Sequence, residues 1–207
     1  MKHGCLFYAA LFLSVIAVLL LMASLWLGFA PVPAGSKATQ QIEGTGFLIQ
    51  QSAGQNAEII SPDGAMVFSA YHIGAAKTVG DYIVFDYTAY TSSRHLLDCT
   101  AYMRTDDYRV KTIDTNSQIA AVIDSSRVVI SKVPLFLVNK EHPERYLFAY
   151  ADRGTAFAAA GKDVLTCVTL PDLHKTEYVT DGHGKLSETG YTDLQGNLHT
   201  WEVLFGE

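Results

Sequence analysis

An uncharged apolar stretch of 26 residues, Cys5 to Ala30, constrains this chain of 207 residues more than any other feature. A helix rises about 1.5 Å per residue, so about 20 apolar residues cross a hydrocarbon core of about 30 Å. Tyr8 and Trp26 lie near the two ends of the stretch, and such aromatic rings favour the membrane–water interfaces. We therefore expect residues 5–30 to be a transmembrane anchor in contact with the lipid bilayer.

A cleaved signal peptide is the competing interpretation, because Val32-Pro-Ala34 places small residues where a peptidase cleaves. The apolar run is, however, longer than the usual signal core of about 7–15 residues. Lys2 and the α-amino group favour a cytoplasmic tail at residues 1–4 by the positive-inside bias. Both interpretations place the rest of the chain outside the cytoplasm, and we expect the periplasmic side of a bacterial inner membrane.

Residues 31–42 are expected to form a linker that leads to a folded domain at residues 43–207. Pro31 has no N–H to continue a helix ladder, so the anchor should end near Ala30. The remaining length suits one domain with its own core. The net charge is −6 and no cluster of Lys or Arg occurs, which argues against nucleic acid as a partner.

The segments after residue 43 alternate as β-strands do and carry no sustained helical stripe. Asp81–Tyr90 shows the clearest period of two, with Ile83 and Phe85 on one face and Val84 and Asp86 on the other. We expect an all-β exported domain, built as an antiparallel meander, a sandwich or a propeller-like array. The expected strands are Gly46–Gln50, Glu58–Ser61, Ala65–Tyr71, Asp81–Tyr90, Leu96–Met103, Gln118–Asp124, Arg127–Lys132, Leu135–Val138, Arg145–Ala151, Asp163–Thr169, Lys175–Thr180 and Leu198–Phe205.

A weak internal repeat consists of four segments that begin at a small turn residue and run into apolar sequence. Their starts are Gly64, Ser117, Gly154 and Gly196. This pattern resembles the blades of a β-propeller, in which a small-residue inner strand recurs. The resemblance covers about residues 60–205 and lacks the usual Gly-His and Trp-Asp signatures. A plain antiparallel meander, a sandwich and an incomplete propeller explain the same pattern.

The cysteines of the exported domain, Cys99 and Cys167, form an even pair. In an oxidising compartment such a pair can form a disulfide if the two Cα atoms approach within about 7 Å. Two buried free thiols are the alternative, because free cysteine is among the residues most often buried in proteins. The sequence leaves both readings open.

No spacing typical of a catalytic, phosphate-binding or metal-binding motif occurs, so we expect no cofactor and no metal. The remaining catalytic candidate is His183, with Asp181 or Asp193 as its carboxylate. The flanking glycines indicate a hairpin turn more simply. Exposed tyrosines often make protein contacts, and the candidates for an interaction surface are Tyr82, Tyr90 and Tyr108.

These observations favour a non-catalytic module, anchored in the membrane, that recognises another envelope or membrane protein. A subunit of an envelope complex and an inhibitor or immunity-type factor both fit this description. Two alternatives stay open. One is an envelope hydrolase that uses His183 with a nearby carboxylate, since active sites are often assembled from distant loops. The other is a sensor domain for a small ligand, which needs a pocket.

Overall fold

The computed structural model describes residues 38–52, 54–90, 96–132 and 162–206. The chain divides into two compact units, Met1–Ser36 and Lys37–Glu207, and every described residue belongs to the second unit. The expected anchor at residues 5–30, with Tyr8 and Trp26, lies outside the described residues. Within the described ranges, no helix combines the length and the apolar character that crossing a bilayer requires.

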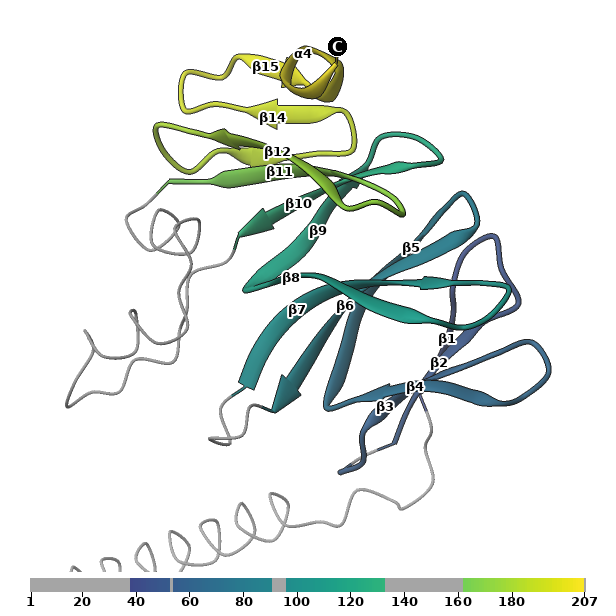
Figure 1. Cartoon of the computed structure of the whole chain (residues 1–207). Helices are drawn as coiled ribbons and strands as arrows, with labels where there is room; N and C mark the ends of the chain where they lie inside the picture. Colours follow the sequence, from purple (N-terminus) through teal and green to yellow (C-terminus); the bar gives the residue numbers. More distant parts are fainter. Residues whose placement is uncertain (1–37, 53, 91–95, 133–161, 207) are drawn as a thin grey trace, which may run out of the picture. The chain divides into compact units, whose positions relative to one another are not determined.

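The described residues form four antiparallel sheets, which confirms the all-β class (Figure 1). Each sheet is a meander, so strands that follow one another in sequence also pair with one another. The first sheet contains β1 (Ala38–Gln41), β2 (Leu48–Gln51), β3 (Ala57–Ile60) and β4 (Met66–Ala70). The second contains β5 (His72–Val79), β6 (Tyr82–Tyr90), β7 (Leu96–Arg104) and β8 (Val110–Thr115).

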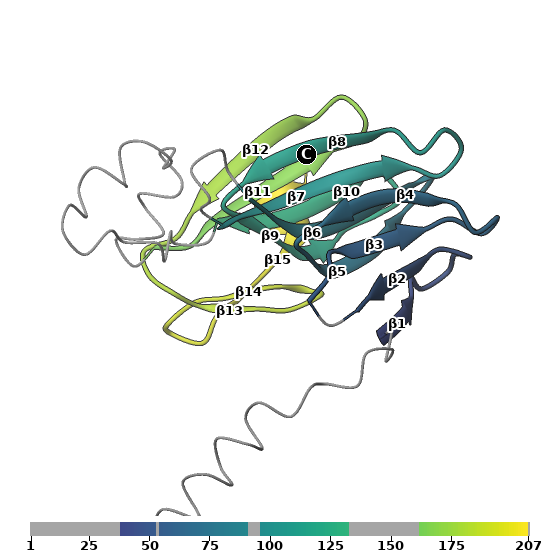
Figure 2. The same cartoon turned by 90° about the horizontal axis from the view of Figure 1, so that it is seen from below.

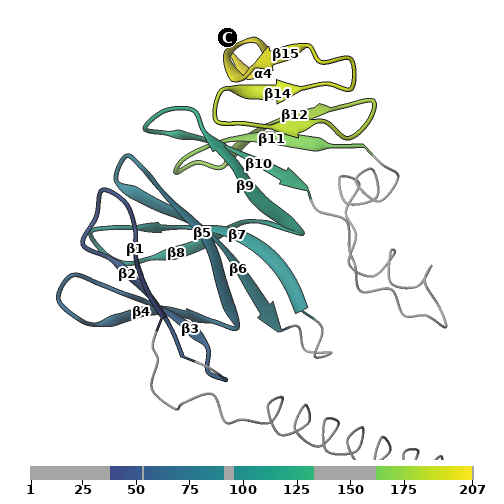
Figure 3. The same ribbon diagram turned by 180° about the vertical axis from the view of Figure 1, so that it is seen from behind.

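The third and fourth sheets continue the same order along the chain. The third contains β9 (Ser117–Val122), β10 (Arg127–Lys132), β11 (Val164–Thr169) and β12 (His174–Val179). The fourth contains β13 (Lys185–Leu186), β14 (Gly190–Thr192) and β15 (Leu198–Thr200), and the short helix α4 (Trp201–Phe205) follows it directly. Figures 2 and 3 show that sheets consecutive in the chain are also neighbours in space.

Three apolar clusters hold neighbouring sheets together. The first cluster joins the first and second sheets, the second joins the second and third, and the third joins the third and fourth. Representative members are Ile49, Ile59, Ile83 and Phe85 in the first cluster, Val84, Tyr102, Val128 and Ile130 in the second, and Val129, Leu165, Tyr191 and Trp201 in the third. The two middle sheets are therefore packed on both faces.

The alternation expected for Asp81–Tyr90 is confirmed in β6. Ile83 and Phe85 belong to the first cluster, whereas Val84 belongs to the second. A strand that is buried on both faces needs apolar residues at consecutive positions. This explains why Val128, Val129 and Ile130 of β10, all fully buried, form a continuous apolar run.

Single residues carry the chain from one sheet to the next. Tyr71 connects β4 to β5, and Asn116 connects β8 to β9. Asn116 has a φ of 51°, a left-handed conformation that asparagine tolerates better than most residues. Its backbone N–H donates to the carbonyl oxygen of Asp98 over 2.6 Å, which ties the connection to β7.

Several expected elements differ from the structure. β1 lies inside the segment expected to be a linker, and the strands β5, β8, β13 and β14 had no sequence counterpart. The segment Leu198–Phe205 was expected to be one strand, but only Leu198–Thr200 is a strand and the rest is helix α4. The expected strands at residues 135–138 and 145–151 lie outside the described residues.

The frame of the expected repeat was wrong. Gly64 precedes the fourth strand of its sheet, Ser117 begins a first strand, and Gly196 precedes a third strand. These three positions are not equivalent, because the strands that follow them have different places in their sheets. Gly154 lies outside the described residues. The equivalent first strands begin at residues 38, 72, 117 and 185.

Of the two readings that the sequence leaves open for Cys99 and Cys167, the structure has the free buried thiols and not the disulfide. Cys167 belongs to the third cluster and so faces the fourth sheet. Cys99 lies two residues before Ala101 in β7, and residues two apart in a strand share a face. Ala101 belongs to the first cluster, so Cys99 also faces the first sheet. The two side chains therefore point in opposite directions from sheets that pack about 10 Å apart, which is too far for a bridge.

Candidate functional site

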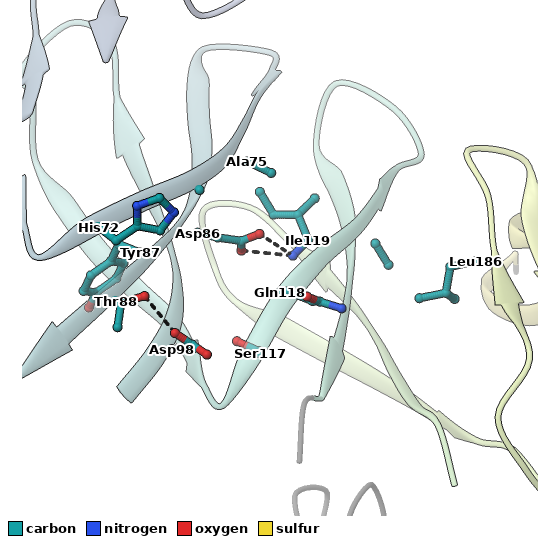
Figure 4. Close-up of a pocket in the computed structure, with 12 residues that line it drawn as sticks. His72, Ala75, Asp86, Tyr87, Thr88, Asp98, Ser117, Gln118, Ile119 and Leu186 are labelled. Atoms are coloured by element: carbon teal, nitrogen blue, oxygen red, sulfur yellow. Dashed lines mark hydrogen bonds between the residues drawn. The ribbon is translucent and has the colours of Figure 1, made fainter. Parts of the chain in front are cut away.

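A pocket of about 480 Å³ lies beside the first strands β5, β9 and β13 of three consecutive sheets (Figure 4). We call it the first-strand pocket and define it by its lining residues. They are His72, Gly74, Ala75, Asp86, Tyr87, Thr88, Asp98, Ser117, Gln118, Ile119, Ala120 and Leu186. The polar members come from β5, β6, β7 and β9, so the pocket exists because the sheets are stacked.

Asp86 joins the second sheet to the first strand of the third. Its two carboxylate oxygens each accept from the backbone N–H of Ile119 at 3.0 Å, as Figure 4 shows. The hydroxyl of Thr100 donates to Asp86 Oδ1 at 2.9 Å, and the hydroxyl of Ser117 donates to Thr100 at 3.0 Å. The backbone of β9, an edge strand, therefore finds its acceptor in a side chain of β6.

The protonation of Asp86 responds to this environment. Burial raises the pKa of its carboxyl to about 6, against the hydrogen bonds from Ile119 and Thr100, which lower it. The nearby charge of Asp98 raises the Asp86 pKa further. Desolvation therefore outweighs the hydrogen bonds, and the group changes charge within the range of ordinary physiological conditions.

A row of polar side chains continues the pocket towards solvent. His72 pairs with Thr88 across β5 and β6, and Thr88 pairs with Asp98 across β6 and β7, so the three share one face. The hydroxyl of Thr88 donates to Asp98 Oδ1 at 2.8 Å. No hydrogen bond from another described residue reaches Asp98 Oδ2 or the imidazole of His72.

Tyr90 stands at the outer end of the same face, and Tyr71, in the connection between β4 and β5, packs against it. Tyr90 is 58% exposed and Tyr71 is 44% exposed, and their rings meet edge to face with centroids 4.9 Å apart. A second pocket of about 360 Å³ lies beside them, lined by Gln51, Gly54, Gln55, Asn56, Tyr71 and His72. His72 lines both pockets.

Of the three tyrosines expected at an interaction surface, Tyr90 is the exposed one. Tyr82 packs against the second cluster and meets Tyr102 edge to face at 5.4 Å. Tyr108 packs against the first cluster and meets Phe47 edge to face at 5.8 Å. Tyr71 had not been singled out, because its role depends on its place at the connection between two sheets.

His183 has a carboxylate partner, but neither of the two expected ones. Its Nδ1 lies 2.8 Å from Asp163 Oδ1, while the other oxygen of Asp163 accepts from the N–H of Gly184. Asp193 instead pairs with His199, with Nε2 and Oδ2 3.1 Å apart. The neighbouring Asp181 is exposed. The two His–Asp pairs fasten turns, and His183 lines none of the three pockets described for this domain.

The described residues contain no group of three or more His, Cys, Asp or Glu side chains that could hold a metal ion. Sequence reasoning had placed Asp86 only on the more polar face of its strand. A lone carboxylate inside Ile83-Val-Phe-Asp-Tyr87 is the signal that could have marked it. No family model, no curated protein and no solved structure matches this chain.

Proposed function

We propose that this chain is a membrane-anchored, extracytoplasmic binding module without catalytic activity, and that the first-strand pocket is its recognition site for another envelope or membrane protein. The observation that carries the proposal is the pocket itself. It combines the Asp98 carboxylate, whose Oδ2 accepts no hydrogen bond from a described residue, with the His72 imidazole, and the exposed Tyr71 lies next to His72 in the chain. Concave sites with a few convergent polar groups are where proteins most often bind partners or ligands.

The chemistry of the lining favours binding over catalysis. A hydroxyl nucleophile needs a base within hydrogen-bond reach. Of the three hydroxyls that line the pocket, those of Ser117 and Tyr87 meet other hydroxyls, Thr100 and Thr112. Only the hydroxyl of Thr88 meets a carboxylate, Asp98, and no hydrogen bond from another described side chain orients that carboxylate as a base. Asp86 is held by Ile119 and Thr100, so its oxygens are engaged in the fold.

An envelope hydrolase built on His183 is the weaker alternative. His183 does meet a carboxylate, Asp163, and this pair is the observation in its favour. The His183 side chain is 61% exposed, however, and the same carboxylate clamps the turn at Gly184. A sensor for a small ligand differs from our proposal only in the size of what enters the pocket.

We also propose that the four stacked meanders are propeller-like rather than a sandwich. A sandwich has one core between two sheets. Here each of three interfaces between consecutive sheets has its own apolar cluster, and the first-strand pocket is lined from β5, β9 and β13. Successive four-stranded meanders with their first strands on a common side are the arrangement of propeller blades.

Protease protection tests the proposed location. Protease added to intact spheroplasts that express the full chain should degrade residues 38–207 and leave a fragment protected by the membrane. A domain that becomes sensitive only after the membrane is disrupted would mean that it lies in the cytoplasm. Loss of the anchor from the mature protein would support the signal-peptide alternative.

Site-specific photo-crosslinking tests the proposed recognition site. A photo-reactive residue at position 118, in the pocket, should give a discrete crosslinked product in membranes that contain the full chain. The matched control is position 195, another exposed glutamine, which lies in the β14–β15 turn. The product from position 118 should disappear with Asp98→Asn. Equal products from both positions, or none from position 118, would refute the proposed site.

A further inference from the structure

We propose that the first-strand pocket recognises a cationic group, an ammonium or a guanidinium, that enters between Asp98 and Tyr90. This inference rests on the proposed function and names the chemistry of what is bound. It is drawn from the register of the second sheet, the exposed aromatic pair and the charges of the lining.

The face of the second sheet that points towards the third sheet changes character along β6. Tyr82 and Val84 belong to or pack against the second apolar cluster, and Asp86 follows at the edge of that core. Thr88 lines the pocket, and Tyr90 ends the strand in solvent. The same row of side chains therefore runs from the buried core, through the carboxylate of Asp86, to the exposed ring of Tyr90.

Asp98 supplies the primary contact for a cation. It pairs with Thr88 in the strand register, while Tyr90 pairs with Leu96. Asp98 and Tyr90 are thus diagonal neighbours on one face, a separation of about 7–8 Å that long and aromatic side chains bridge. Asp98 is exposed, and its Oδ2 accepts no hydrogen bond from a described residue. A donor group between the two side chains would meet a free carboxylate oxygen on one side and a ring on the other.

The tyrosine pair supplies the second contact. Tyr71 and Tyr90 meet edge to face and are 44% and 58% exposed, so part of each ring surface is open to solvent. The face of an aromatic ring attracts cations through its quadrupole. Tyr71 also lines the adjoining pocket with Gln51, Gln55 and Asn56, whose amide oxygens are further acceptors for N–H donors.

The charge of the lining selects against anions. Among the described residues that line the two pockets, two are carboxylates and none is Lys or Arg. A neutral ligand would form no ion pair with Asp98, whereas a cation would form one and would also be attracted by the charge of Asp86. Hydrogen bonds between charged partners are roughly twice as strong as neutral ones. The volume of about 480 Å³ is enough for a basic side chain or a small amine.

The test uses the full chain in lipid nanodiscs at pH 7.5, with butylammonium and methylguanidinium as cationic probes and butan-1-ol as the neutral analogue. Calorimetry should show at least about tenfold tighter binding of the cations than of butan-1-ol. Asp98→Asn keeps the acceptor for Thr88 and removes the charge, so it should weaken cation binding by roughly five- to tenfold. Tyr90→Leu should weaken it by about two- to fivefold.

Asp181→Asn is the matched control, because Asp181 is exposed, lies outside both pockets and changes the net charge by the same amount. It should alter cation binding by less than about twofold, the effect of a screened distant charge. Equal weakening by Asp98→Asn and Asp181→Asn, or equal affinity for butan-1-ol and butylammonium, would overturn the inference. Thermal unfolding of each variant identifies a loss of affinity that comes only from misfolding, and Tyr90→Leu then provides the independent test.

A peptide arm separates the two sources of such a cation. If a basic side chain of a protein is the natural ligand, acetyl-Gly-Arg-Gly-amide should bind at least as tightly as methylguanidinium. If a free small amine is the ligand, the peptide should bind more weakly; either result supports cation recognition. Crosslinking from position 118 without any preference for cations would leave the proposed binding function standing and remove this inference alone.

Discussion

Asp86 shows at the scale of one residue how packing sets a chemical property. Val84, two residues earlier on the same face of β6, belongs to the second cluster. At the position of Asp86, however, the neighbouring sheet presents the backbone N–H of Ile119 instead of an apolar side chain. A carboxylate satisfies that donor, and the cost of burying its charge appears as a raised pKa. The stability of the contact between the second and third sheets should therefore depend on pH through the protonation of Asp86.

The first prediction concerns the pH dependence of stability. An aspartate with a pKa of 3.8 when unfolded and about 6 when folded binds more protons in the folded chain between these values. The stabilisation is fully present below about pH 4 and is lost as the pH rises through about 6. The unfolding free energy should therefore increase by about 1–3 kcal/mol between pH 7.5 and pH 5 relative to Asp86→Asn.

Urea unfolding of the full chain in detergent, at half-unit steps of pH, measures this difference. His72 and Asp98 line the same pocket and also carry ionisable side chains. The comparison with Asp86→Asn cancels their contribution, since the variant keeps them all. Parallel pH profiles for the wild type and Asp86→Asn would show that Asp86 does not change its protonation in this interval.

At the scale of an element, the C-terminal segment shows why a pattern can mislead. A strand over Leu198–Phe205 would place Trp201, Val203 and Phe205 on one face. In the structure Val203 is 75% exposed, whereas Trp201 and Phe205 are buried in the third cluster. Residues four apart share a helix face, and the hydroxyl of Thr200 accepts from the N–H of Val203 at the helix start. Trp201 and Phe205 would share a face in a strand, with its period of two, and also in a helix, where residues four apart are neighbours. Packing against the third cluster favours the helix.

The strands that the sequence did predict share strong local signals. β6 and β10 are rich in Val, Ile, Phe and Tyr, and turn residues such as Asp124 bound the latter. β5 contains Gly74, Ala75 and Ala76, which favour strands weakly, and it forms because β6 pairs with it. The site follows the same division: Tyr90 was visible in the sequence, whereas Asp86 acts through the backbone of Ile119, which no residue pattern records.

The second prediction tests whether tertiary packing forms helix α4. Five residues are too few for a stable isolated helix, so the element should depend on Trp201. Its side chain is 4% exposed, and its indole N–H donates to the carbonyl oxygen of Glu188 at 3.0 Å. Trp201→Ala should lower the unfolding free energy by about 3–5 kcal/mol.

Chemical denaturation followed by tryptophan-independent far-UV circular dichroism measures this loss. The control is Val203→Ala in the same helix, which should change stability by less than about 0.5 kcal/mol because Val203 is exposed. A similar loss in both variants would mean that helix propensity, and not the packing of Trp201, holds the element in place.

At the scale of the whole described domain, chain order and spatial order coincide. Each sheet contacts the next one in sequence through its own apolar cluster, so residues on opposite faces of the stack are kept apart by intervening layers. The order of the sheets determines which side chains from distant strands can meet, and the spacing of residues in the sequence does not. A pair of cysteines in separate strands is the clearest instance, because only the facing of each strand determines whether they meet.

The third prediction follows for Cys99 and Cys167. Cys99 faces the first sheet and Cys167 faces the fourth, so both should stay reduced even in an oxidising compartment. The full chain, denatured without reductant and treated with N-ethylmaleimide, should be alkylated at both residues by peptide mass analysis. Reductant should leave its unfolding midpoint unchanged, although a bridge closing such a loop would contribute about 4 kcal/mol. A Cys99–Cys167 peptide that disappears on reduction would show that the strands face differently and that the order of the sheets is wrong.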